Sequence, residues 1–103
     1  MIISTFSNKE EAKKISKILL KERLVACANI IPEIESLYWW KEEIQEEKEV
    51  IAYFKTKKKL ERVVIARIKE LHSYDVPAIY AIESMELIYE PYREWVEKET
   101  KEE

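Results

Sequence analysis

Hydrophobic and polar residues alternate with a period of two along two neighbouring stretches, residues 25–40 and 44–56. Such alternation is typical of β-strands, because successive side chains of a strand point to opposite faces. The apolar residues on one side are Ala28, Ile30, Ile34, Tyr38 and Trp40 in the first stretch, and Ile44, Val50, Ala52 and Phe54 in the second. Polar residues 41–43 separate the two stretches. The pattern therefore predicts a long β-hairpin with a short turn.

This hairpin is too long for the domain that carries it. A strand over residues 25–40 would span roughly 50 Å at ~3.3 Å per residue, whereas a domain of this size has a radius of gyration of only ~13 Å. We expect the hairpin to bend or to extend beyond its domain, with Pro32, which has no backbone donor, at the bend or bulge. The residues beyond Pro32 include Leu37, Tyr38, Trp39 and Trp40. One small domain could hardly cover this apolar surface, which predicts self-association.

The N-terminal part of the chain predicts a strand followed by a helix. Residues 1–6 are mostly apolar and fit a short strand. Ser7 and Glu10 have the spacing of a capping box, in which each side chain bonds a free backbone N–H at the helix start. Apolar residues at helical spacing then predict an amphipathic helix over residues 8–22.

The part after the hairpin predicts a helix, a strand and a final helix. Thr56 is a suitable N-cap for the first of these, which we expect to end near residues 72–75. Residues 76–83 fit a strand that starts just after Pro77, and residues 85–90 show no clear pattern. Pro91 suits the first turn of the last helix, and we expect residues 98–103 to fray.

The order strand, helix, hairpin, helix, strand, helix indicates an α+β fold. It corresponds to a ferredoxin-like (split βαβ) arrangement with one added C-terminal helix, in which two helices cover one face of an antiparallel sheet. The 103 residues contain no linker and suffice for one core, so we expect a single domain over residues 1–103.

Composition restricts the partners of the protein. Charged residues make up 38% of the chain, and this content of mixed charges suits a heat-stable protein. The net charge of −3 argues against nucleic acid as a partner, since that binding needs a clustered basic field. The only basic cluster, Lys55 with Lys57, Lys58 and Lys59, is expected to be solvated.

The compartment is expected to be the cytoplasm. The single cysteine, Cys27, excludes an intramolecular disulfide and fits a reducing environment. The chain shows neither the basic and apolar segments of a signal peptide nor an apolar run of the ~20 residues that a membrane span needs.

Most catalytic classes lack their residues here. The chain contains no glycine, so the phosphate-binding loops of nucleotide and dinucleotide enzymes are absent. One histidine and no marked nucleophile leave no basis for a catalytic relay. We therefore expect a protein that is not an enzyme and uses no organic cofactor.

His72 is the main candidate for metal ligation. Its imidazole suits copper, zinc or nickel, but it needs further ligands, for which Cys27, Asp75, a glutamate or a neighbouring subunit are candidates. The alternatives are structural. His72 fits the C-terminus of a helix, and Cys27 fits a small buried apolar side chain. Trp39 and Trp40 fit interface packing or a platform on which a ligand stacks.

Four motifs occur together in one order and spacing: residues 23–29 (RLVACAN), 36–40 (SLYWW), 55–56 (KT) and 72–77 (HSYDVP). In this combination the chain resembles the CutA family of divalent-cation tolerance proteins over essentially its whole length. The resemblance implies a PII-like homotrimer in which the long hairpins of neighbours pair edge to edge. It also implies a cytoplasmic location and a link to copper(II) or other divalent cations.

The chain departs from the family pattern at two places. Family members commonly have glycine in the turn after the tryptophan, where this chain has residues 41–43 (KEE). The copper ligands proposed for some bacterial members match Ser4, Leu71 and His72 here, and only His72 is of a ligand type. The leading hypothesis is a non-enzymatic trimer of this family that binds a divalent metal ion, copper first, and supports metal tolerance. The second hypothesis is a PII-like signalling or scaffold trimer that binds a small molecule or partner protein in its inter-subunit clefts. Lys55, Tyr38 and Trp40 are the candidate cleft residues, with Trp39 at the interface.

Overall fold

The structure is a computed structural model that describes residues 1–83 and 88–102. Of residues 85–90, for which the pattern predicts no element, 85–87 lie outside the described residues. The elements in chain order are β1 (Ile2–Phe6), α1 (Lys9–Lys21), β2 (Cys27–Trp40), β3 (Glu43–Lys55), a 3₁₀ helix (Lys58–Leu60), α2 (Glu61–Leu71), β4 (Ile79–Ala81) and α3 (Glu90–Glu99). This is the predicted order of elements.

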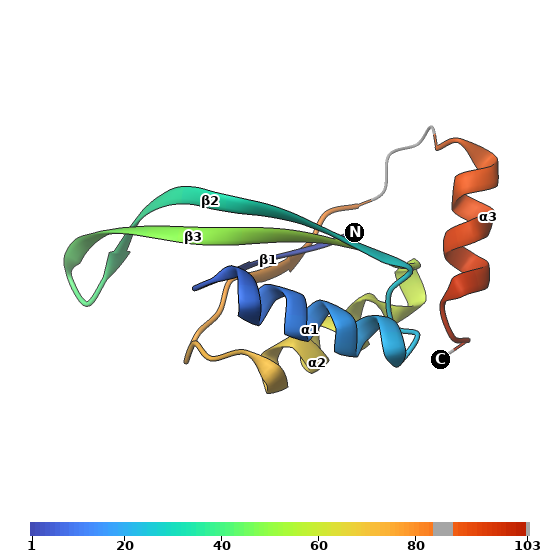
Figure 1. Cartoon of the computed structure of the whole chain (residues 1–103), viewed down its shortest axis with the longest axis horizontal. Coiled ribbons are helices and arrows are strands. Elements are labelled where there is room, and N and C mark those ends of the chain that lie inside the picture. The colour runs from blue at the N-terminus through green and yellow to red at the C-terminus, as the bar shows by residue number, and fades with distance from the viewer. Residues whose placement is uncertain (84–87, 103) are drawn as a thin grey trace.

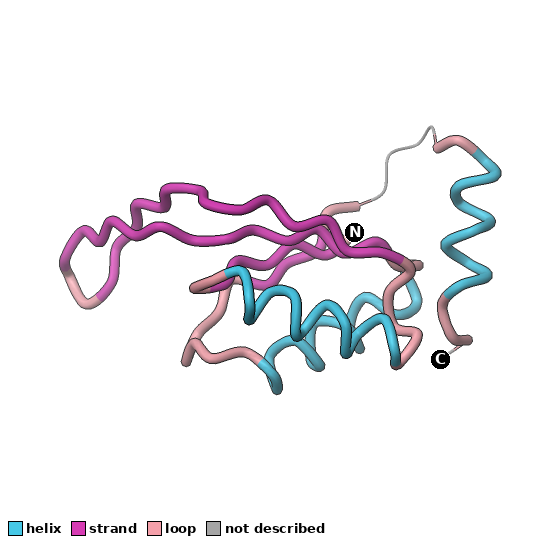
Figure 2. Tube along the Cα trace, viewed as in Figure 1, coloured by secondary structure: helices cyan, strands magenta, loops and turns pink. Residues whose placement is uncertain are grey.

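The strands form one antiparallel sheet in the order β2-β3-β1-β4. Helices α1 and α2 lie together on one face of this sheet, and α3 stands beside it (Figure 1). Figure 2 shows the same arrangement, with the helices beneath the strands. The predicted ferredoxin-like α+β fold with an added C-terminal helix is confirmed.

The hydrophobic core lies between the sheet and the two helices. Phe6 and Phe54 are fully buried, and their rings meet edge to face with centroids 6.4 Å apart. Helix α1 contributes Ala12, Ile15 and Leu19 to the core, and the segment through α2 contributes Leu60, Val64 and Ile68. The helical spacing of these residues is the apolar stripe that the sequence shows.

Helix α1 begins one residue later than the capping-box prediction requires. The N-cap is Asn8, in an extended conformation, and its Oδ1 accepts a hydrogen bond of 2.8 Å from the Glu11 amide. Ser7 instead donates its hydroxyl to the Glu11 carboxylate at 3.3 Å. The prediction of a Ser7–Glu10 box was wrong because asparagine is an equally strong N-cap and lies one position closer to the helix.

Thr56 does not cap α2. Its hydroxyl donates to the Leu24 carbonyl at 2.6 Å, which ties the end of β3 to the segment before β2. A 3₁₀ turn then precedes α2, whose N-cap position is Leu60 with no side-chain hydrogen bond. The prediction of Thr56 as the N-cap was therefore wrong, because its hydroxyl bonds a residue that is distant in sequence instead of the start of the helix.

The hairpin of β2 and β3 extends well beyond the helices (Figure 1). The molecule measures 45 Å along its longest axis, against 27 and 21 Å along the other two. The prediction that the hairpin outgrows its domain is confirmed. Its outer half is a two-stranded ribbon, and no helix in the described part of the chain covers either face of it (Figure 1).

A β-bulge at Pro32 and Glu33 changes which residues share a face. Ile31 pairs with Ile51, but the next pair is Ile34 with Glu49, and Glu33 has a φ of 56°. The bulge at Pro32 is thus confirmed. Because β2 has one extra residue here, side chains beyond the bulge point to the face opposite to the one that a simple alternation predicts.

The prediction that Ile34, Tyr38 and Trp40 share a face with Ala28 and Ile30 was therefore wrong. Ile30 pairs with Ala52, which is buried under the helices. Glu46 and Ile44 lie on the same face of β3 as Ala52, because they are an even number of residues away from it. Their partners beyond the bulge are Leu37 and Trp39, so these two side chains lie on the face that carries the helices. Tyr38 and Trp40, paired with Gln45 and Glu43, lie on the helix-free face.

The C-terminal part is more ordered, and its strand shorter, than predicted. Strand β4 covers only Ile79–Ala81 of the expected residues 76–83. Pro91 lies in the first turn of α3, as predicted. The expectation of fraying was wrong for Thr100, whose hydroxyl donates to the Val96 carbonyl at 2.9 Å, and for Lys101, whose amide donates to the Arg23 carbonyl at 2.8 Å.

The hairpin turn stores backbone strain. Lys41 and Glu42 form a two-residue turn with φ angles of 50° and 66° between the paired Trp40 and Glu43. A turn with positive φ at both central residues favours asparagine followed by glycine, because other residues suffer steric contact with the backbone.

We expect Lys41→Asn combined with Glu42→Gly to stabilise the protein by about 1 kcal/mol, since the new residues tolerate this turn. The midpoint of urea unfolding measures the effect. The matched control Lys48→Asn with Glu46→Gly places the same residue types within β3 and should lower the midpoint. A lower midpoint for the turn variant would contradict the assigned turn.

Candidate functional site

The predicted interface residues gather at the far end of the hairpin. Trp39 is 71% exposed and Trp40 is 44% exposed, while Tyr38 hydrogen-bonds Glu47 across the ladder. Leu37 and Ile44, on the same face as Trp39, are 65% and 62% exposed. Both faces of the ribbon therefore carry large bare side chains, as the sequence predicts for the region beyond Pro32.

Lys55 lies at the opposite end of the hairpin. It pairs with Cys27 at the start of β2, and its ammonium group hydrogen-bonds the Asn29 amide oxygen. From Cys27 to Tyr38, β2 covers roughly 36 Å at ~3.3 Å per residue. Within one subunit the structure does not bring Lys55 together with Tyr38, Trp39 and Trp40, so a shared cleft requires the hairpin of a second subunit.

Cys27 is half-buried beside α3. Its Sγ lies 3.5 Å from the Tyr92 hydroxyl, and the Tyr92 ring stacks on Trp95 with centroids 5.7 Å apart. Burial and the hydrogen bond with Cys27 raise the pKa of Tyr92 to about 12. The thiol thus helps to hold α3 against the hairpin base, together with the Arg23–Glu99 ion pair at 2.9 Å.

His72 is the residue just after α2, and its side chain is fully buried. Its Nε2 donates a hydrogen bond of 2.7 Å to the Thr5 carbonyl, and its Nδ1 accepts one of 3.2 Å from the Tyr74 amide. The ring also stacks on Phe6 with centroids 4.8 Å apart. Both ring nitrogens are therefore engaged in fastening the loop after α2 to β1, and neither has a lone pair available for a metal ion.

Glu11 reinforces this fastening. Its Oε2 accepts a hydrogen bond of 2.8 Å from the Ser73 amide and lies 3.9 Å from His72 Nδ1. Burial opposes ionisation of Glu11, but the hydrogen bonds from Ser73 and Ser7 outweigh it and lower the pKa of the carboxyl below its ordinary value. An ionised Glu11 thus links α1 to the loop.

The sequence does not predict a buried contact that the structure shows between Tyr74 and Glu49. The Tyr74 hydroxyl donates to the Glu49 carboxylate at 2.7 Å, and Glu49 is only 7% exposed. Burial of the phenol and its bond to the negative Glu49 raise the pKa of Tyr74 above its ordinary value. No periodicity separates Glu49 from its exposed neighbours, so only the tertiary fold identifies it.

The three predicted metal ligands do not form one centre within a subunit. Cys27 pairs with Lys55 at the C-terminal end of β3, next to the start of β1. His72 bonds Thr5 near the other end of β1, and Asp75 is exposed in the loop after α2. Ser4 is buried, and its hydroxyl donates to the Ala78 carbonyl at 2.7 Å. Across residues 1–83 and 88–102, no group of three or more His, Cys, Asp or Glu side chains is placed to hold a metal ion.

No helix in the described part of the chain combines the length and the apolar character that crossing a membrane requires. The described helices are instead amphipathic, with charged residues on their outer faces.

Comparisons with known proteins place this fold in a family. A family model described as CutA1 divalent ion tolerance protein matches residues 1–99. The divalent-cation tolerance protein CutA of Pyrococcus horikoshii is 48% identical over 101 residues, which cover 98% of this chain and 97% of that protein.

Solved structures agree with this match. The crystal structure of CutA1 from Oryza sativa has a TM-score of 0.94 at 34% identity and covers 99% of this chain and 93% of its own. A structure described as the periplasmic divalent cation tolerance protein CutA from Archaeoglobus fulgidus has a TM-score of 0.92 at 33% identity, covering 97% and 96%. The long hairpin, the ferredoxin-like sheet and these matches together show that the chain belongs to the CutA1 divalent ion tolerance protein family.

Proposed function

We propose that this protein acts in divalent-cation tolerance as a homotrimer and is not an enzyme. The observation that carries the proposal is the outer half of the hairpin, which exposes large apolar side chains on both faces. A lone two-stranded ribbon is marginally stable in water. Cover from another subunit would stabilise it.

The edge of the sheet also favours association. Strand β2 lies at the edge, so its outer side is unpaired within the described residues. A long exposed edge strand is a template for pairing with another chain. A hairpin that reaches onto a different surface of the next subunit makes a head-to-tail contact, which forms a ring when the rotation between subunits closes. A ring of three is what the family resemblance implies.

We propose further that copper(II) or another divalent cation binds between subunits. Within one subunit His72 does not fit a metal ligand, because both of its nitrogens are already bonded. Cys27 is half-buried near the hairpin base, and carboxylates are abundant along the hairpin. In the trimer, ligands from two subunits would come together without rearrangement of either fold.

A calorimetric titration of Cu²⁺ into the assembled protein, with a weak competing chelator, tests this proposal. We expect the His72→Gln variant to bind Cu²⁺ with the stoichiometry and affinity of the unchanged protein, because glutamine replaces only a structural group. Loss of binding in a folded His72→Gln variant would make His72 a ligand after all. Absence of competitive binding in both proteins would contradict the proposed metal site.

The hairpin base supports a second candidate function, a signalling or scaffold trimer with a ligand in its inter-subunit clefts. The ammonium of Lys55, the amide of Asn29 and the hydroxyl of Tyr92 lie near one another around Cys27. Such a polar set beside aromatic rings suits a small anionic molecule. A thermal-shift screen with small carboxylates and phosphates separates the two functions, since a cleft ligand should stabilise the protein without added Cu²⁺ and should lose its effect in Lys55→Ala.

We propose a cytoplasmic location, which the single free thiol supports. The relative described as periplasmic supplies the alternative. Fractionation of the host cells decides between them.

A further inference from the structure

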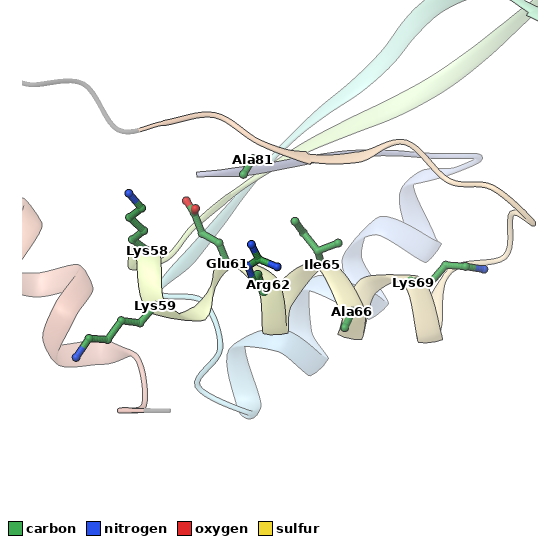
Figure 3. A pocket seen from close by; sticks show the side chains of 8 residues that line it. All are labelled: Lys58, Lys59, Glu61, Arg62, Ile65, Ala66, Lys69 and Ala81. Carbon is green, nitrogen blue, oxygen red and sulfur yellow. The ribbon is translucent and has the colours of Figure 1, made fainter.

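A groove runs along α2 on the side next to β4 (Figure 3). It encloses about 890 Å³, and the residues that line it are Lys58, Lys59, Glu61, Arg62, Ile65, Ala66, Lys69 and Ala81. Its cationic side chains extend from the 3₁₀ turn and from successive turns of the helix. None of the residues assigned above to a metal site or to an inter-subunit cleft lines this groove, so neither proposed function uses it.

The charge of the groove opposes the charge of the whole chain. Among the described residues that line the groove, four are cationic and only Glu61 is acidic. The Glu61 carboxylate is already paired with the N-terminal ammonium of Met1 at 3.0 Å. Among the described residues, Lys58, Lys59 and Arg62 form no salt bridge. A chain with a net charge of −3 thus gathers cations without acidic partners in one place.

Two arginines outside the groove are already paired with carboxylates. Arg67, on the same helix, bonds Glu22 at 2.7 Å, and Arg93 approaches Glu90 at 3.6 Å. Lys58, Lys59 and Arg62 form no salt bridge among the described residues, and Lys69 donates to the neutral Asp75 carbonyl at 3.0 Å, so negative groups on a partner would complement these four charges.

The shape and the floor of the groove restrict that partner. Lys58 and Lys69 are separated by roughly 17 Å along the helix axis, which is the length of about five extended residues. Ile65, Ala66 and Ala81 form an apolar floor between the cations. A polyphosphate or a nucleic-acid backbone has no apolar group to place there, whereas a peptide that alternates acidic and apolar side chains fills both parts.

We propose that this groove binds an extended acidic peptide segment of a partner protein, with apolar side chains on the floor and carboxylates facing Lys58, Arg62 and Lys69. The segment lies along α2 with its apolar side chains against Ile65, while its carboxylates meet the cationic side chains that extend from the helix at the rim of the groove. This interaction links the protein to another chain and requires no metal ion.

Fluorescence anisotropy of the full-length protein with a labelled peptide of about six residues that alternates Glu and Leu tests the proposal at about 0.15 M salt. We expect saturable binding that the pair Lys58→Glu and Arg62→Glu weakens at least about tenfold. The matched pair Lys13→Glu and Lys17→Glu makes the same charge change on exposed residues of α1 and should leave binding within about twofold.

Two further probes distinguish the peptide from other anions. A peptide with Ser in place of Leu should bind at least about fivefold more weakly, because it cannot cover the apolar floor. Tripolyphosphate and a short single-stranded oligonucleotide should compete poorly with the Glu–Leu peptide. Equal binding of the Ser peptide, tighter binding of either phosphate polymer, equal loss in the α1 control, or no saturable binding up to about 1 mM would each overturn the proposal.

Discussion

Replacing Trp40 with alanine is expected to dissociate the trimer at micromolar concentration. In a single chain Trp40 is 44% exposed on the helix-free face of the ribbon, and in the proposed assembly a neighbouring subunit covers it. Loss of a buried aromatic ring commonly costs about 3–5 kcal/mol. Each subunit of the ring loses one such contact, so the loss to the assembly is threefold.

Light scattering of the Trp40→Ala variant measures this effect, and thermal unfolding measures the accompanying loss of stability. The matched control is Glu46→Ala, which removes an exposed charge from the same hairpin and should change stability by only about 0.5 kcal/mol. An unchanged mass and melting temperature in Trp40→Ala would show that no partner buries the ring.

Replacing His72 with alanine is expected to destabilise the fold by about 2–4 kcal/mol. The change removes a fully buried ring that stacks on Phe6, and it leaves the Thr5 carbonyl and the Tyr74 amide without their partner. An unsatisfied buried polar group costs about 1–3 kcal/mol, and the lost packing adds to this.

Urea unfolding of the metal-free protein measures the effect of His72→Ala. Glutamine at this position retains a donor for Thr5, so His72→Gln should recover part of the loss. Asp75→Ala is a suitable control, because Asp75 is exposed and the bond that it forms with Lys69 uses its backbone carbonyl, which alanine retains. Equal stability of the His72→Ala and unchanged proteins would contradict the structural role of the imidazole.

The sequence predicts the fold because its elements have clear periods. The apolar residues of α1 and α2 recur at helical spacing, and β2 and β3 alternate over a length that only an overhanging hairpin explains. The tryptophans beyond Pro32 further predict that apolar side chains at the end of the hairpin are exposed in a single chain. These features depend on local pattern and chain length, so tertiary contacts do not override them.

Local competition explains where the sequence prediction fails. Asn8 and Ser7 are both good N-caps, and the sequence alone does not say which hydroxyl or amide a tertiary partner will use. Thr56 bonds Leu24 rather than the start of α2. One extra residue at Glu33 exchanges the two faces of β2, and the alternation pattern does not reveal the position of that exchange.

The candidate site depends on contacts that no local pattern contains. His72 is correctly placed at the end of α2, but its ring nitrogens bond to Thr5 and Tyr74, one of which is far away in sequence. Cys27 and His72 are both of ligand types, but Cys27 pairs with Lys55 at the hairpin base whereas His72 bonds Thr5 in β1, and no local pattern predicts this separation. The groove along α2 contains lysines that were expected to be solvated, and their apolar floor becomes visible only when β4 packs beside the helix.

The mass of the native protein in solution tests the central claim most directly. Multi-angle light scattering at micromolar concentration should give about three times the 12.4 kDa of one chain, because the bare hairpin needs the cover of its neighbours. A mass of a single chain under the same conditions would leave Leu37, Trp39, Trp40 and Ile44 in water and would contradict the account of the hairpin.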